Sequence, residues 1–173
     1  MLESFTQALA PWHDFYALLG ATAAALLGLL FVAVSLHLDS LTAAVQGLAY
    51  ETFNHFVTLL LIAFLCLIPA LPPSWFGVGL LLLGLGGAVR LAWRRRAEPA
   101  QERLGLPTPR RRDVLPALAY LLLVGLGLWY LAGQTGLLGV LVAVDFLLLI
   151  QATWRAWEML LYLGARKSPG PAE

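Results

Sequence analysis

Asp145 is the residue with the clearest chemical potential, because it interrupts the apolar stretch from 137 to 157. An Asp at the centre of a bilayer costs about 2.5 to 3.5 kcal/mol on translocon-based scales. We therefore expect its side chain to face the protein interior or a water-filled path. The candidate hydrogen-bonding partners at comparable depth are Thr22, Thr58, Cys66 and Tyr120. Two interpretations stay open: a protonated carboxyl that donates a structural hydrogen bond, or a carboxyl beside water that takes up a proton or a cation.

A second polar group lies around the end of the first apolar run, and it comprises His37, Asp39, Glu51 and His55. On a helix, Glu51, His55 and Thr58 share one face, so a carboxylate and an imidazole could bind a divalent metal or pass a proton. His37 comes close if the next helix begins near Tyr50, and it stays far away if that helix begins near Leu41. The alternative is a polar cluster that faces the cytoplasm, and on this interpretation we expect no metal and no cofactor.

Small residues recur at four-residue steps in the first apolar run, at Gly20, Ala24 and Gly28. Such spacing lets helix backbones approach closely in lipid, where packing drives association. The stripe predicts either packing within one chain or the contact face of a homo-oligomer. A second set of glycines, expected to favour close packing in the third run, comprises Gly77, Gly79, Gly84, Gly86 and Gly87.

Arg155 and Glu158 are three residues apart near the end of the last apolar run, with Gln151 one turn before them. Their spacing suits a pair on a helix surface, and we expect both to snorkel to the lipid headgroups. The serines are few, and no His is placed to serve one of them as a base. The sequence therefore predicts no catalytic residues.

The composition indicates that a membrane must surround these groups. The 173 residues are 60% hydrophobic and 12% charged, with a mean hydropathy of +0.80, whereas soluble domains carry about 25% charged residues. A net charge of +1 gives no dense basic face for nucleic acid. Cys66 is the only cysteine, which excludes an intrachain disulfide.

Five apolar stretches reach the roughly 20 residues that a transmembrane helix needs. They span about 15–36, 52–71, 75–93, 114–132 and 137–157. The fold class is thus all-α, a single membrane domain in which polytopic helices form a bundle. Before the first span, Leu2, Phe5, Leu9 and Trp12 recur at roughly helical spacing, which predicts a short surface helix or a frayed terminus.

The basic residues set the expected orientation, because Lys and Arg accumulate on the cytoplasmic side. With the N-terminus outside and the C-terminus cytoplasmic, every Lys and Arg falls inside, on the ends of the spans, on the loop 94–113 or on the tail 164–173. Tryptophans fall near the ends of the predicted spans, where their amphipathic rings are favoured.

The first span carries a family resemblance. The stretch from Phe15 to Ser35, with its run Gly20-Ala21-Thr22-Ala23-Ala24-Ala25, resembles the first helix of small uncharacterised bacterial membrane proteins, some of which are labelled modulators of the FtsH protease. The stretch from Glu51 to Pro69 is similar to their second helix. The resemblance covers about a third of the chain, and it implies a location in the bacterial inner membrane.

From these features we expect a non-enzymatic, multi-pass inner-membrane protein that self-associates and acts as a scaffold or modulator of other membrane proteins. Its expected partners are the lipid bilayer, further copies of itself and another membrane protein, with no nucleic acid. Two alternatives remain. One is a small ion channel or proton-coupled carrier that uses Asp145, and the other is a membrane enzyme that uses His37, Glu51 and His55.

Overall fold

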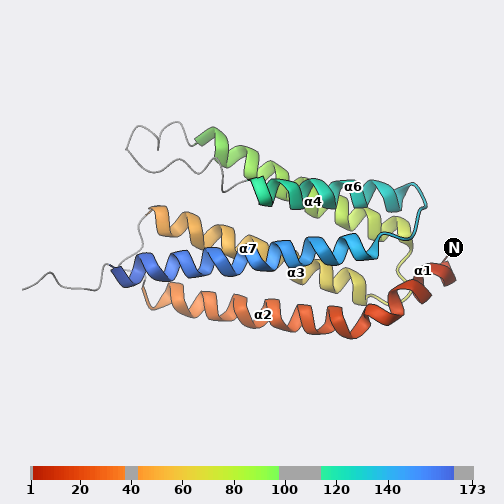
Figure 1. Ribbon diagram of the computed structural model, residues 1–173, viewed down its shortest axis with the longest axis horizontal. Helices are drawn as coiled ribbons and strands as arrows, with labels where there is room; N and C mark the ends of the chain where they lie inside the picture. Colours follow the sequence, from red (N-terminus) through yellow and green to blue (C-terminus); the bar gives the residue numbers. More distant parts are fainter. Residues whose placement is uncertain (1, 38–42, 98–113, 166–173) are drawn as a thin grey trace, which may run out of the picture. The chain divides into compact units, whose positions relative to one another are not determined.

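The computed structural model describes residues 2–37, 43–97 and 114–165, and within these ranges all regular structure is helical. The chain begins with a short helix, α1 (Leu2–Leu9), and a 3-10 turn, η1 (Ala10–Trp12). Five long helices follow (Figure 1): α2 (His13–Ser35), α3 (Ala43–Leu67), α4 (Pro73–Ala97), α6 (Val114–Leu131) and α7 (Leu138–Ala165).

Five candidate membrane spans lie in the described ranges, each long and apolar enough to cross a bilayer. The shortest, Val114–Leu131, has 18 residues, which extend about 27 Å at a rise of about 1.5 Å per residue. The prediction of an all-helical, multi-pass membrane protein is confirmed to this extent. Three helices are clearly longer than predicted, since α3 begins at Ala43, α4 continues to Ala97 and α7 continues to Ala165.

Proline and glycine form the turns that follow α3 and α6. Helix α3 ends at Leu67, two residues before Pro69, whose ring and missing N–H are incompatible with further helix. Ala70 then adopts a φ of 54°. Gly133 follows α6 with a φ of 78°, a left-handed conformation that glycine adopts without strain. Its N–H donates to the carbonyl of Tyr130 at 3.0 Å.

The chain forms two compact units that interleave in sequence. Unit 1 comprises Met1–His13 and Leu65–Leu147, and unit 2 comprises Asp14–Phe64 and Leu148–Glu173. Helices α3 and α7 each contribute to both units.

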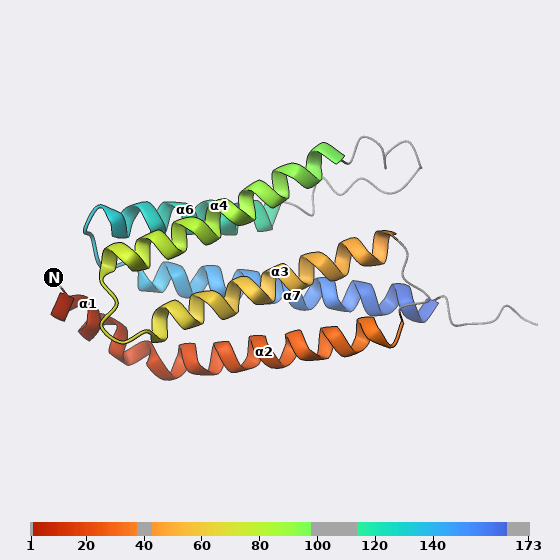
Figure 2. The same cartoon turned by 180° about the vertical axis from the view of Figure 1, so that it is seen from behind.

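Close contact between the backbones of α4 and α6 organises unit 1, in which these two helices lie side by side (Figures 1 and 2). A Cβ atom built on Gly127 of α6 would lie 2.7 Å from the amide nitrogen of Leu81. A Cβ atom on Gly77 of α4 would lie 2.8 Å from the carbonyl oxygen of Gly127. These positions therefore require glycine, which confirms for Gly77 the close packing expected of the third-span glycines.

Three aromatic rings attach the N-terminal helix to unit 1. The Phe5 ring of α1 lies 5.3 Å from that of Phe76 and 5.6 Å from that of Tyr130, measured between centroids. All three side chains are buried. Edge and tilted contacts at such distances are favourable. The short helix expected before the first span is thus present and packs through Phe5, whereas its place on the membrane surface stays a prediction.

Unit 2 is built from α2, all of α3 except its last residues and the part of α7 that begins at Leu148, with α3 and α7 running antiparallel (Figure 1). Leu30, Val45 and Met159 form one core cluster, to which each of the three helices contributes a residue. Nearer the N-terminal end of α2, a Cβ atom on Gly20 would lie 3.2 Å from the Cβ atom of Ala63 of α3.

Candidate functional site

A buried arginine joins α7 to α3 in unit 2. Arg155 is only 6% exposed. Its Nε forms an ion pair with the Oε2 atom of Glu51 at 3.3 Å, and its Nη1 donates to the Oε2 atom of Glu158 at 3.5 Å. The side chains of the two glutamates are 13% and 14% exposed. One guanidinium thus holds two carboxylates, one from its own helix and one from α3.

The second glutamate is positioned by the helical repeat of α7. Glu158 lies three residues after Arg155 and four after Trp154, so all three side chains meet on one face. The indole Nε1 of Trp154 donates to the Oε1 atom of Glu158 at 3.1 Å. Each Glu158 oxygen therefore has a donor, and the carboxylate is held towards Arg155.

One turn further along both helices lie His55 and Gln151. His55 follows Glu51 by four residues and Gln151 precedes Arg155 by four, so antiparallel helices place them at the same level. His55 is 4% exposed. Both polar atoms of the Gln151 amide are buried, and neither has a hydrogen-bond partner among the described residues. We call Glu51, His55, Gln151, Arg155 and Glu158 the ion-pair cluster.

The ion-pair cluster includes Glu51 and His55 of the predicted polar group but not His37. The Nδ1–H of His37 donates to the carbonyl oxygen of Ala33, 2.9 Å away on its own helix. Helix α3 begins at Ala43, close to the early start that keeps His37 apart from Glu51 and His55. No set of three metal-ligating side chains gathers within the described ranges, and Asp39 lies outside them. Metal binding by the polar group stays a prediction.

The predicted pairing of Arg155 with Glu158 is confirmed, but the expectation that Arg155 lies on the helix surface and snorkels to the headgroups is wrong. The structure instead buries Arg155 against α3. The available signal was the spacing of Gln151, Arg155 and Glu158, which places three polar side chains on one face of an apolar helix. Their partner on α3 could not be identified, because local periodicity does not say which helices meet.

The predicted intramembrane polar residues are divided between the two units. Asp145 of α7 is 0% exposed and Tyr120 of α6 is 5% exposed, and both belong to unit 1. Thr22 is partly buried in α2, in unit 2. The Thr58 hydroxyl, also in unit 2, donates to the carbonyl of Asn54 at 2.7 Å. Asp145 thus has no exposed surface, as expected of a carboxyl at this depth.

The small-residue stripe of α2 is only partly used within the chain. Gly20 is buried and packs against Ala63. Ala24 and Gly28 are exposed, and a Cβ atom on Gly28 would meet nothing within 4 Å.

Comparisons with protein-family models, with curated proteins and with solved structures find no match to this chain.

Proposed function

We propose that this protein is a non-enzymatic scaffold or modulator of the bacterial inner membrane, which self-associates through α2 and binds other membrane proteins. The observation that carries the proposal is the free side of α2. Ala21, Ala24 and Gly28 are all exposed along it, with large apolar side chains such as Leu18 (69% exposed) and Leu29 (65%) beside them.

Such a surface is suited to a second helix rather than to lipid alone. Small residues at four-residue steps leave a shallow groove along the helix, and a partner helix that enters it gains packing contacts at close backbone distance. The exposed flanking leucines extend the contact on either side. A copy of the same helix offers the same groove, which supports a homo-oligomer.

The ion-pair cluster supports a scaffold more than an enzyme. Its charges are directed at one another, since Arg155 holds Glu51 and Glu158 between two helices. An enzyme would instead direct a nucleophile and a base towards a substrate. The resemblance of the first span to labelled modulators of a membrane protease supports the same choice.

Self-association is tested by the mass of the purified protein in mild detergent, measured by light scattering. We expect an oligomer for the wild type and a shift towards monomer for Ala24→Leu and Gly28→Leu, because a bulky side chain separates the backbones. The matched control is Leu82→Ala on α4, which changes an exposed side chain elsewhere and should leave the mass unchanged. A monomeric wild type, or oligomers in both α2 variants, would contradict the proposal.

A second candidate function is a proton-coupled carrier, favoured by the presence of an ionisable carboxyl, Asp145, within the apolar span Leu138–Leu161. The substitution Asp145→Asn keeps the size and a hydrogen-bond donor but removes the ionisable group. On the carrier hypothesis, this variant should abolish pH-dependent ion flux in proteoliposomes while the protein keeps its oligomeric mass. No flux in the wild type, or equal flux in the variant, would leave the scaffold as the better proposal.

A further inference from the structure

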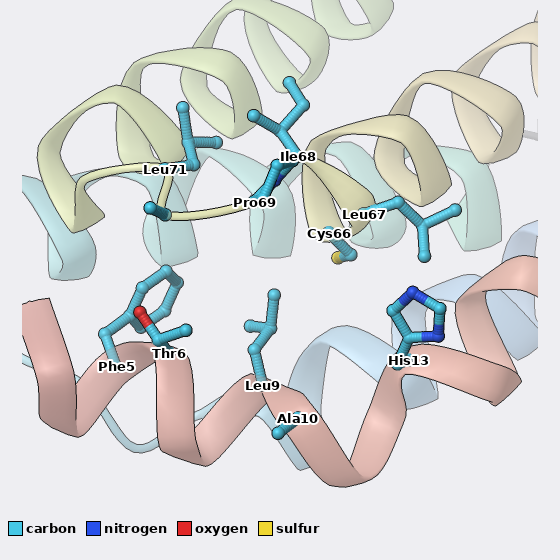
Figure 3. Close-up of a pocket in the computed structure, with 11 residues that line it drawn as sticks. Phe5, Thr6, Leu9, Ala10, His13, Cys66, Leu67, Ile68, Pro69 and Leu71 are labelled. Carbon is cyan, nitrogen blue, oxygen red and sulfur yellow. The ribbon is translucent and has the colours of Figure 1, made fainter.

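A cavity of about 420 Å³ opens in unit 1 beside the N-terminal helix. One side is formed by the segment from Phe5 to His13, and the other by the end of α3 and the turn that follows, from Cys66 to Leu71. In Figure 3, Leu9 and His13 point from the first segment towards Cys66 and Leu67 on the second. The cavity lies at one end of the candidate spans Phe5–Ser35 and Val45–Leu67.

Different contacts hold the two sides of the cavity in place. On one side, the Phe5 ring packs against the rings of Phe76 and Tyr130. These contacts keep the N-terminal segment from packing along the end of α3. On the opposite side, Pro69 ends the helical path and Ala70 turns the chain at a φ of 54°. The short side chains of Ala10 and Ala70 line the space between them.

The lining selects an apolar occupant with a polar end. Most of the eleven lining residues are apolar, and the polar ones are Thr6, His13 and Cys66. Ligand pockets in proteins have this character, with volumes of about 300 to 1,000 Å³ and a few polar groups that orient the ligand. Thr6 and His13 are exposed whereas Cys66 is buried, so the polar end of a ligand would lie beside Thr6 and His13.

The volume indicates how much hydrocarbon fits. A cavity of about 150 Å³ holds one benzene molecule, so at the same scale 420 Å³ holds roughly sixteen carbon atoms. This is the size of one fatty acyl chain. The lipids around a membrane span present such chains in great excess over any other apolar molecule.

We propose that this cavity is a lipid site, in which one acyl chain of a membrane phospholipid lies between the N-terminal segment and the end of α3, with its headgroup beside His13. The acyl chain covers apolar surface of Phe5, Leu9 and Leu67 that would otherwise contact water or disordered lipid. Its binding also joins α1 to the end of α3, whereas the aromatic contacts of Phe5 join α1 to α4 and α6. The proposal requires that the protein lies in a bilayer, but it does not require self-association.

Cys66 provides the readout, because it is the only cysteine and lines the cavity. Delipidated wild-type protein in a bile-salt detergent is treated with N-ethylmaleimide, with and without added phosphatidylglycerol. We expect a roughly tenfold slower alkylation at a lipid concentration ten times the dissociation constant, because only the unoccupied fraction reacts. Alkylation at the same rate with and without lipid would overturn the proposal, and this measurement needs no variant.

Native mass spectrometry supplies the second readout. Wild-type protein should retain one phospholipid, and Ala10→Trp should lose it because the indole fills the cavity. Ala132→Trp, a change at an exposed alanine that does not line the cavity, is the matched control and should retain the lipid. Retention by Ala10→Trp would also refute the site. Protection of Cys66 by palmitate but not by phosphatidylglycerol would replace the phospholipid with a free fatty acid and overturn the assignment made here.

Discussion

At the scale of the residue, the burial of Arg155 carries a large desolvation cost. A guanidinium taken out of water loses several kcal/mol of solvation, which its partners return only when the geometry is good. Here Glu51 contributes from α3, and Glu158 contributes from α7 with a further hydrogen bond from Trp154. Removal of the guanidinium leaves two partly buried carboxylates facing each other.

We predict that Arg155→Leu lowers the free energy of unfolding by about 3 to 5 kcal/mol, the usual cost of removing one member of a buried ion pair. Glu51→Gln should cost less, because Glu158 still compensates Arg155. Both are measured by thermal or denaturant unfolding in detergent. Arg90→Leu is the control, because Arg90 is exposed and its loss should change stability by roughly 0.5 kcal/mol at most. Equal effects of Arg155→Leu and Arg90→Leu would show that the ion pair does not join the helices.

At the scale of the element, the contact between α4 and α6 depends on the absence of side chains. Gly77 and Gly127 allow the two backbones to approach until no room is left for a Cβ atom at either position. In lipid, such close packing supplies much of the attraction between helices.

We predict that Gly127→Ala destabilises the protein by about 1 to 3 kcal/mol, the usual cost of overpacking. The new methyl group would lie 2.7 Å from a backbone nitrogen of α4, and a backbone cannot move aside as a flexible side chain can. Gly125→Ala is the matched control, two residues away on the same helix, where a Cβ atom meets nothing within 4 Å. It should be neutral or slightly stabilising. If the two variants unfold at the same temperature, the contact is looser than described.

At the scale of the whole molecule, the distribution of Lys and Arg predicts which ends of the helices lie in the cytoplasm. We expect the loop 94–113 inside and the turn between α6 and α7 outside. In a Cys66→Ser background, an impermeant maleimide added to spheroplasts should label Gln134→Cys and leave Gln101→Cys unlabelled. Inverted vesicles should give the opposite result. Labelling of Gln101→Cys in intact spheroplasts would reverse the orientation.

The spans could be read from the sequence because a helix surrounded by lipid and other helices is apolar on every face. The start of α3 was harder to place, since the turns after Ala43 contain Gln46 and Gly47, which weaken the apolar signal without preventing helix. The burial of Asp145 followed from its depth alone. The pairing of Glu51 with Arg155 could not be predicted from the sequence, because it depends on which helices, distant in sequence, become neighbours.

The interleaving of the two units constrains how the protein is made. Glu51 enters the membrane with α3, but Arg155 arrives only with α7, after α4 and α6 have been synthesised. During that interval the core of unit 2 consists of α2 and α3 alone, and the Glu51 carboxylate lacks the guanidinium. The contact between α4 and α6 needs no such late partner and can form as soon as its glycines meet. Synthesis that stops before α7 would therefore leave α4 and α6 able to pair but the Glu51 carboxylate without its compensating charge.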